Sequence, residues 1–516
     1  MDKYINGMDI SFVPQYEELG MVAKDFDGTP MDALELAKKY GVNSIRLRLW
    51  NEPKNFPESG GYCNLAYTMD MARRIKAQEM SFMLDFHYSD WWADPGNQRK
   101  PRAWENLKGQ ELEKAVYTFT KETLETLKAE GILPNIVQIG NEIRSGLIFP
   151  DGEVPDYEGM VRLINAGIKG AREVAGAEEL QVMIHLDQGG RYALLKEWFD
   201  KALANGLADF DLIGLSYYPF WHGTFQDLKD TMERLLEDYH KPIMIVETAY
   251  AWRKSKAGFI DDDQIRLSGV EATPEGQLKV LELVNRIVES LPNGMGRGTY
   301  YWEPLCIPRP GKGGWDDNMG LLGEDGKVNI GIKAFNYTRE QKDEKRLAEL
   351  LQEVATAIEA SNNLEPVCDG ANLLNNADFQ NEWKEWHLEV SDGVDVQILT
   401  MEQEEAAGRN KKALRVESLK NFTFSIMQHV DIAESGKYAL KVEFQGTDTT
   451  NVDVRLFAAT ASGWYWERVI HPSEHGYTGY GIRDISCGEE KLTVGIKIVS
   501  PPMHFIVKDF CLTKQP

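Results

Sequence analysis

The sequence predicts an α/β fold, a (β/α)8 TIM barrel, followed by a smaller antiparallel β-sandwich of jelly-roll type. Three observations support this fold class. Short apolar runs typical of β-strands recur eight times along the first 305 residues. Amphipathic segments with helical spacing separate these runs, such as 31–40, which ends at Gly41. After residue 370 the pattern changes to short alternating runs with turn residues between them, which is typical of a β-sandwich.

The eight barrel strands follow one another at a regular spacing. A (β/α)8 barrel typically takes about 250 residues, so the observed length leaves room for long loops. An open doubly wound sheet is the alternative, but no strand is followed by G-x-G-x-x-G and no P-loop is present. We predict barrel strands at 5–11, 44–50, 81–88, 136–142, 181–186, 211–218, 243–250 and 298–304.

The chain divides into three predicted parts. A length of 516 residues is enough for two or three domains. We assign 1–338 to the barrel, 339–370 to a charged amphipathic helix and a linker, and 371–516 to the β-sandwich. The sandwich strands are predicted at 413–417, 438–444, 452–457, 492–498 and 504–512.

Composition excludes several classes of function. The net charge of −24 argues against nucleic-acid binding, which needs clustered Lys and Arg. No apolar stretch approaches the roughly 18 residues of a membrane helix. Acidity combined with 13 tryptophans suits a neutral, hydroxyl-rich ligand, although acidity alone also serves solubility.

The cysteines and the start of the chain bear on location. The five cysteines are scattered and form no C-x-x-C pair, which predicts neither a disulfide framework nor a zinc site. The chain starts Met-Asp-Lys and enters a strand almost at once, without a signal peptide. We therefore expect a cytoplasmic protein, or a secreted one if an export signal has been removed.

Two glutamates end apolar runs on opposite sides of the predicted ring. Glu142 ends the fourth strand, and Glu247 ends the apolar run of the seventh. Both carboxylates are then expected at the C-terminal mouth, where barrel enzymes hold their active sites. A small barrel brings such groups to about 5 Å, the separation expected in a retaining glycosidase. One carboxylate would act as acid and base, and the other as nucleophile.

The other strand ends also carry polar or aromatic side chains, which a purely structural barrel would not need. A catalytic metal is the main alternative for this mouth, but no His-x-His pair occurs, and we predict no metal ligands. A Ser-His-Asp triad lacks its G-x-S-x-G turn. The predicted substrate-binding side chains are Arg46, Asp85, His87, Trp91, Trp92, Asn141, His185, Tyr217, Tyr218 and Trp302.

The tryptophans at 91 and 92 lie in a loop rich in polar residues. Exposed indole rings stack on the apolar faces of pyranoses, so this loop is a candidate wall of a sugar cleft. The alternative is a loop that its own aromatic side chains hold in place.

Seven motifs follow the predicted strands along the first part of the chain. They are 7–11 (GMDIS), 43–50 (NSIRLRLW), 85–95 (DFHYSDWWADP), 138–142 (QIGNE), 214–221 (GLSYYPFW), 246–250 (VETAY) and 301–304 (YWEP). In series they resemble glycoside hydrolase family 53, over about residues 5 to 335. The resemblance implies a retaining (β/α)8 endo-β-1,4-galactanase that cuts the galactan side chains of pectin, known as type I arabinogalactan.

The resemblance also implies a role for each matching residue. Glu142 would be the acid/base and Glu247 the nucleophile, which an adjacent Arg46 would keep ionised. The implied supporting set is Asn141 at the sugar 2-OH, His87 and Tyr217 or Tyr218 in the same subsite, and Trp302 stacked on a sugar.

The loop after the seventh strand departs from the calcium-binding members of this family. Some bacterial members bind calcium there through an Asp-rich loop. In this chain Asp261, Asp262 and Asp263 are consecutive, without the alternation that a chelating loop shows. We therefore expect no required cofactor, and this loop does not support a structural calcium.

The C-terminal part resembles a carbohydrate-binding β-sandwich. Residues 372–375 (NLLN) resemble the opening of such modules, and 507–512 (VKDFCL) resemble their last strand. Trp464 and Trp466 alternate, and with Trp386 they form a candidate sugar platform. The alternative is a sandwich that binds no sugar and packs on the barrel.

The leading prediction is an endo-acting retaining β-1,4-galactanase. Its expected partners are galactan or galacto-oligosaccharides, with no nucleic acid and no membrane, and we expect a monomer. A barrel glycosidase of other specificity, such as a mannanase or a xylanase, would share the two glutamates. A non-catalytic galactan-binding protein is the third hypothesis.

Overall fold

The computed structural model divides the chain into two compact units, Met1–Ala355 and Thr356–Pro516. The division falls within helix α11 (Glu344–Asn362), so the charged helix predicted between the domains begins in the first unit. The structure describes residues 3–260, 262–309, 311, 313–362, 371–381, 384–391, 394–400, 412–418, 422–446, 453–463, 465–470, 478–500 and 503–515.

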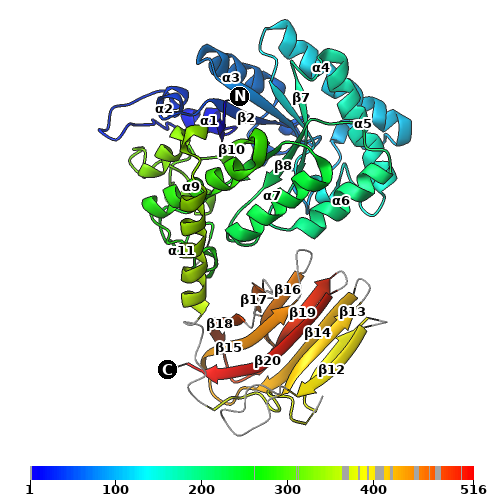
Figure 1. Cartoon of the computed structure of the whole chain (residues 1–516), viewed down its shortest axis with the longest axis vertical. Coiled ribbons are helices and arrows are strands. Elements are labelled where there is room, and N and C mark those ends of the chain that lie inside the picture. Colours follow the sequence, from blue (N-terminus) through cyan, green and yellow to red (C-terminus); the bar gives the residue numbers. More distant parts are fainter. Residues whose placement is uncertain are drawn as a thin grey trace. The chain divides into compact units, whose positions relative to one another are not determined.

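The first unit is a closed barrel of eight parallel strands, which confirms the predicted fold class. Each strand lies beside its neighbours in the sequence, with β10 closing the ring against β1. Helices lie outside the strands (Figure 1). The barrel strands are β1 (Ile5–Asp9), β2 (Ser44–Leu49), β3 (Ser81–Phe86), β4 (Ile136–Ile139), β7 (Gln181–Leu186), β8 (Leu212–Ser216), β9 (Ile243–Thr248) and β10 (Gly296–Trp302). A small hairpin of β5 (Gly146–Leu147) and β6 (Gly152–Glu153) follows β4.

Among the described helices between the strands, α2, α3, α5, α7 and α9 begin at a side-chain cap. In α7, Thr224 and Asp227 form a reciprocal capping box that satisfies free backbone donors at the first turn. The buried residues Leu228, Met232 and Leu235 recur at helical spacing and face the barrel. The helices of this unit are α1 (Val13–Glu18), α2 (Ala33–Lys39), α3 (Leu65–Ala77), α4 (Gly109–Ala129), α5 (Tyr157–Val174), α6 (Tyr192–Ala204), α7 (Phe225–Tyr239), α8 (Asp262–Ser268), α9 (Pro274–Ser290) and α10 (Trp315–Asn318).

Apolar side chains fill the interior of the barrel towards the N-terminal ends of most strands. They form one buried cluster, which consists of Met83, Ile136, Met183, Leu212, Met244, Val246 and Tyr300. Close packing there leaves no room for water or substrate. The polar interior side chains therefore gather at the opposite, C-terminal ends of the strands.

Strand β9 carries a β-bulge beside β8. Ser216 of β8 pairs with Glu247, although the residue before it pairs with Ile245, so β9 contains one extra residue at this level. The pairing with β10 shifts at the same place. Val246 belongs to the interior apolar cluster, and the extra residue lets the next side chain, Glu247, also turn inward. The bulge thus sets the direction of the Glu247 side chain.

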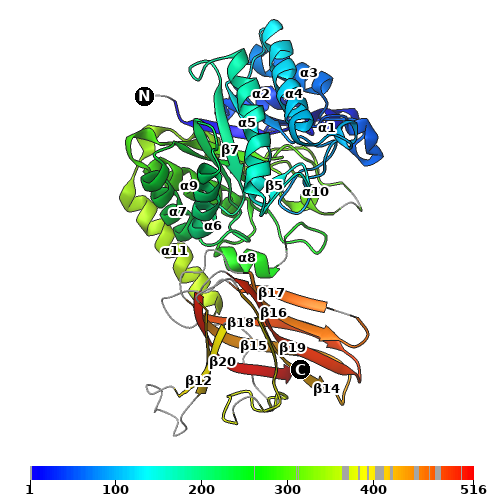
Figure 2. The same ribbon diagram turned by 90° about the vertical axis from the view of Figure 1, so that its right-hand side faces the viewer.

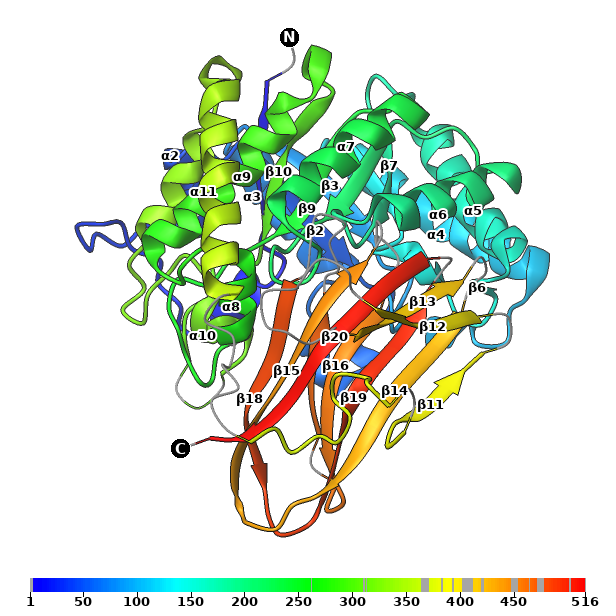
Figure 3. The same cartoon turned by 60° about the horizontal axis from the view of Figure 1, so that its bottom comes forward.

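The second unit is an antiparallel sandwich of two five-stranded sheets, which also confirms the predicted fold class. The sheets pack face to face over one apolar core (Figures 2 and 3). One sheet contains, in order, β11 (His387–Val390), β14 (Phe422–Asp431), β19 (Lys491–Ser500), β16 (Asp453–Thr460) and β17 (Tyr465–Ile470). The other contains β12 (Val394–Thr400), β13 (Lys412–Ser418), β20 (Met503–Lys514), β15 (Gly436–Gly446) and β18 (Thr478–Cys487).

The structure corrects the sugar platform predicted on the sandwich. Trp386 is only 7% exposed and packs against Phe379 and Phe510 in the core. Trp466 is partly buried and also packs on that core, because strand alternation turns it inward. The exposed ring of β17 is its neighbour Tyr465. Trp464 lies outside the described residues.

One cysteine departs from the prediction. Cys511 is disulfide-bonded, although the sequence predicted no disulfide framework. Cys63, Cys306 and Cys487 are free and buried. Among the described helices, each is too short or too polar to span a lipid bilayer.

Candidate active site

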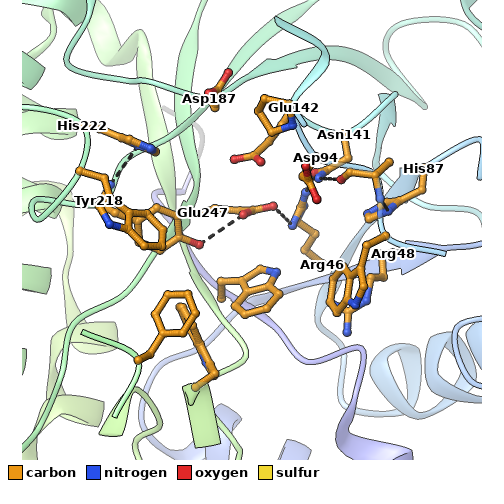
Figure 4. Close-up of a pocket in the computed structure, with 17 residues that line it drawn as sticks. Arg46, Arg48, His87, Asp94, Asn141, Glu142, Asp187, Tyr218, His222 and Glu247 are labelled. Carbon is orange, nitrogen blue, oxygen red and sulfur yellow. Dashed lines mark hydrogen bonds and ion pairs between the residues drawn. The ribbon is translucent and has the colours of Figure 1, made fainter. Parts of the chain in front are cut away.

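A cavity of about 570 Å³ opens at the C-terminal ends of the barrel strands (Figure 4). Its wall combines ionisable groups with aromatic rings, which is the usual composition of a binding site for a polar organic ligand. The lining residues are Arg46, Arg48, His87, Trp92, Ala93, Asp94, Pro95, Asn141, Glu142, Asp187, Tyr218, Trp221, His222, Glu247, Phe259, Trp302 and Trp315.

The two predicted glutamates face one another across this cavity (Figure 4). Strand β4 ends at Ile139, so Glu142 lies three residues beyond it and not on the strand as predicted. Gly140 and Glu142 both have positive φ, 85° and 47°, in the turn that redirects the chain. A left-handed backbone costs free energy in a glutamate, and such strain is often kept at functional sites. Glu247 reaches the cavity by the bulge in β9.

Arg46 connects the groups beneath the cavity. Its side chain is buried, and each of its five N–H donors has a partner. Nη1 contacts Glu247 Oε1 at 2.8 Å, which places a permanent positive charge against this carboxylate. The other partners are Asp9 Oδ2 at 2.8 Å, Asp85 Oδ2 at 2.9 Å, Asn141 Oδ1 at 2.9 Å and Gln138 Oε1 at 3.2 Å.

Glu247 therefore has partners that favour its ionised form. Besides Arg46, the Tyr218 hydroxyl donates to Glu247 Oε2 at 3.3 Å. Burial raises the pKa of Glu247 to about 7, and the Arg46 charge opposes this rise. The guanidinium makes Glu247 the better placed of the two glutamates to carry a negative charge.

Glu142 lies in an environment of the opposite kind. Burial raises the pKa of Glu142 well above its usual value, and the charges of Glu247 and Asp187 raise it further. The Ser216 hydroxyl donates to Glu142 Oε1 at 2.6 Å and is the main opposing influence on this pKa. No cation lies among these causes. Glu142 is thus the natural holder of a proton that the pair shares, and Glu247 the natural anion.

Aromatic rings form a continuous wall on one side of the cavity. Trp302 contacts Trp92 and Trp315, with ring centroids 5.7 and 4.4 Å apart. The Phe259 ring continues this wall. Its centroid lies 5.0 Å from that of Trp315 and 5.4 Å from that of Trp221. Trp221 and Phe259 are 38% and 39% exposed, so their rings are open at the rim. Such faces bind the apolar side of a sugar ring.

Arg48 braces the base of this wall. Its guanidinium lies 4.1 Å from the Phe12 ring and 4.4 Å from the Trp92 ring, which is cation–π geometry. Arg48 Nη2 donates to Glu303 Oε1 at 2.7 Å. Burial raises the pKa of Glu303 to about 8, with Arg48 opposing. The pair orients Trp92 from below.

Most of the predicted substrate-binding residues line the cavity, but four do not. The residues that line it are Arg46, His87, Trp92, Asn141, Tyr218 and Trp302. Asp85 and His185 are fully buried beneath it, where they bond Arg46 and Ser216. Tyr217 is also fully buried and donates to the Gly223 carbonyl at 3.0 Å. Trp91 packs on Trp50 outside the lining, so these four are corrected to supporting positions.

Several lining residues were missed by the sequence analysis. Trp221 lies in the 214–221 motif, and Arg48 alternates with Arg46 on β2, so both had a local signal. Phe259 and Trp315 come from long loops, where no periodic pattern indicates direction. Ser216 was not singled out because serine at a strand end is common.

The metal prediction stays untested. Among the described residues no group of three or more His, Cys, Asp or Glu side chains has the geometry to hold a metal ion. Asp261, and the side chains of Asp262 and Asp263, lie outside the described residues.

The sequence and the fold match known proteins over the barrel. The model of Glycosyl hydrolase family 53 matches residues 5–368. A protein of Aspergillus terreus named probable arabinogalactan endo-beta-1,4-galactanase A is 37% identical over 338 residues, which cover 64% of this chain and 94% of that protein. The solved Ignisphaera aggregans GH53 catalytic domain is 35% identical at a TM-score of 0.61, over 64% of this chain and 95% of that one. A structure from a study of two fungal beta-1,4-galactanases is 30% identical at a TM-score of 0.58. The match covers 64% of this chain and 98% of that one.

Proposed function

Because the chain belongs to glycosyl hydrolase family 53, we propose that it is an endo-acting β-1,4-galactanase that retains the anomeric configuration. The observation that carries the mechanism is the unlike environment of two facing glutamates, one bound to Arg46 and the other not. The galactanases among its relatives support the choice of sugar. The aromatic wall suits a neutral chain of pyranoses better than a charged ligand.

In the proposed reaction Glu142 donates its proton to the leaving glycosidic oxygen while Glu247 attacks the anomeric carbon. The bond to the leaving chain breaks, and an ester forms between Glu247 and the sugar. Glu142, now ionised, takes a proton from a water molecule that attacks the same carbon and frees Glu247. Asn141 keeps one amide hydrogen for the sugar 2-OH, because Oδ1 accepts from Arg46 and the other hydrogen goes to the Ala93 carbonyl.

Substrate preference is the first test of this proposal. The protein is expected to release reducing ends from linear β-1,4-galactan at least about 100-fold faster than from xylan or mannan. Early products should be a mixture of oligosaccharides with a rapid fall in viscosity, as endo cleavage requires. Activity on xylan or mannan without galactan cleavage would favour the other glycosidase specificities. Galactan binding without any hydrolysis would favour a non-catalytic protein.

The pH profile of kcat/KM is expected to be bell-shaped with an optimum above about pH 7. Activity rises as Glu247 loses its proton, because only the carboxylate attacks, and burial raises its pKa to about 7. Activity falls as Glu142 loses its proton, at a higher pH, because its pKa is raised further. An optimum near pH 4 to 5, the ordinary range of glutamate, would contradict this assignment.

The expected partners follow from the reaction. Galactan or its oligosaccharides would bind along the aromatic wall, and a monomer remains the prediction. The disulfide at Cys511 supports the secreted alternative over the cytoplasmic one, since disulfides persist mainly in oxidising compartments.

A further inference from the structure

A buried chain of hydrogen bonds leads from Arg46 to the cavity glutamate Glu142. It begins where Arg46 Nε donates to Gln138 Oε1 at 3.2 Å. A guanidinium can only donate, so this contact fixes which end of the Gln138 amide faces Arg46. The amide nitrogen, Nε2, then lies 2.7 Å from Asp85 Oδ1 and 2.8 Å from His185 Nδ1. Its two hydrogens serve these two acceptors.

The same contacts fix the protonation of His185. Its Nδ1 accepts from the Gln138 amide and lies 3.3 Å from the Glu142 backbone N–H, so two donors point at this atom. Asn141 Oδ1 is also 3.1 Å away, but it already accepts from Arg46. Burial lowers the pKa of His185 well below its usual range, so the ring is neutral. Its one proton therefore sits on Nε2.

The chain ends at the carboxylate of Glu142. His185 Nε2 donates to Ser216 Oγ at 2.8 Å, so the Ser216 oxygen accepts and its own hydrogen is free. That hydrogen goes to Glu142 Oε1, 2.6 Å away. Gln138, His185 and Ser216 are all 0% exposed, so water cannot replace a member of the chain. The direction of donation is then the same at every step.

We propose that Gln138, His185 and Ser216 act as a one-way positioning relay that keeps the transferable proton of Glu142 on Oε2. This inference rests on the proposed function, because it concerns the acid step of that reaction. Oε1 accepts from Ser216 throughout, which favours negative charge on that atom and the proton on the other oxygen, Oε2. Oε2 therefore gives its proton to the leaving oxygen and later receives one from water. Ser216 stabilises the anion that remains between these two transfers.

The relay also bears on the pH dependence of Glu142. The charged groups that face this carboxylate are Glu247 on β9, Asp187 after β7 and Asp94 in the loop after β3, and each raises its pKa. Arg144 contacts Asp187 at 2.8 Å and moderates that charge. Removing the Ser216 donor removes the main opposing influence, so the pKa of Glu142 rises in the variant.

The test compares two substrates in Ser216→Ala, with Ser216→Cys as a second variant that leaves no cavity and replaces the hydroxyl with a weak S–H donor. Galactan needs a proton on its leaving oxygen, whereas 2,4-dinitrophenyl β-galactobioside does not. We expect kcat/KM on galactan to fall about tenfold, the usual effect of losing one hydrogen bond to a charged group. The alkaline limb of the galactan profile should move to higher pH. On the aryl substrate kcat/KM should stay within about twofold of the unchanged protein.

Ser44→Ala is the matched control. Ser44 is a buried barrel serine whose Oγ lies 2.6 Å from the Tyr300 hydroxyl, and it does not line the cavity. In this variant kcat/KM on both substrates should be unchanged, and so should both limbs of the galactan pH profile. Equal losses on both substrates in Ser216→Ala, or an unmoved alkaline limb, would overturn the relay.

Failure of the relay and failure of the proposed function give different results. If the unchanged protein does not cleave galactan, the proposed specificity is wrong. The relay is then tested with aryl glycosides of the sugar that the enzyme does accept, over leaving groups of different acidity. A Ser216→Ala loss that does not grow as the leaving group becomes more basic would overturn the relay in that case also.

Discussion

Replacing Glu247 with alanine is expected to lower kcat/KM on galactan by about 10⁴-fold or more. The proposed nucleophile is then absent and no glycosyl-enzyme can form, which corresponds to a loss of about 5 kcal/mol of transition-state stabilisation. Glu247→Gln should lose activity to a similar degree, because the amide keeps the shape but not the charge. Folding should persist, since Asp9 and Asp85 still neutralise Arg46. Steady-state kinetics and thermal melting measure both effects.

A second buried acid in the same barrel provides the control. Glu289 is 6% exposed and pairs with Arg339 at 2.7 Å, away from the cavity lining. Glu289→Gln should reduce stability without changing kcat/KM by more than about twofold. If Glu247→Ala kept activity within tenfold of the unchanged protein, the nucleophile would have to be another residue.

Replacing Glu142 with alanine is expected to separate two steps of the reaction. Hydrolysis of galactan should fall by about 10²- to 10⁴-fold, because its leaving oxygen needs an acid. Glycosylation by 2,4-dinitrophenyl β-galactobioside should remain fast, and the glycosyl-enzyme should accumulate because no base activates water. Azide needs no base, so it should restore turnover by attacking the anomeric carbon and displacing Glu247.

The configuration of the azide product distinguishes the roles of the two glutamates. Glu142→Ala should give the β-galactobiosyl azide, because azide attacks the glycosyl-enzyme. Glu247→Ala, assayed with the same 2,4-dinitrophenyl β-galactobioside and azide, should give the α-galactobiosyl azide by a single displacement and accumulate no covalent intermediate. A Glu142→Ala variant that azide does not rescue, and that loses activity equally on both substrates, would contradict the acid/base role.

The sequence predicted the barrel well because its strands carry a clear local signal. All eight predicted strands exist, and 181–186 matches β7 to the residue. The turn at Glu142 and the bulge at Glu247 were not predictable. Both depend on how neighbouring strands pair, and pairing register is a tertiary property.

Most errors in the predicted site residues concern how deep a side chain lies along the barrel axis. Asp85 and His185 point inward as alternation predicts, but they lie one layer below the cavity. Period-two patterning gives the face of a strand and not the layer. Phe259 and Trp315 reach the site from loops whose paths the sequence does not encode in any periodic way.

In the sandwich, too, the sequence pattern did not show whether a tryptophan lies in the core or at the surface. Trp386 looked like a sugar platform because tryptophan often serves there, yet it fills the core beside Phe510. Strands such as β14 and β17 were also missed, although β14 alternates buried and more exposed residues, and in β17 the buried Arg468 interrupts the apolar inner face.

The central claim is that Glu247 forms a covalent bond to the sugar during cleavage. A 2-deoxy-2-fluoro-β-galactobiosyl fluoride should form this ester and react further only slowly, because fluorine at C2 destabilises both transition states. Mass spectrometry of the intact protein should show one added fluorogalactobiosyl group, and peptide mapping should place it on Glu247. An adduct on another residue, or continued turnover of the fluoride without any adduct, would contradict the proposed mechanism.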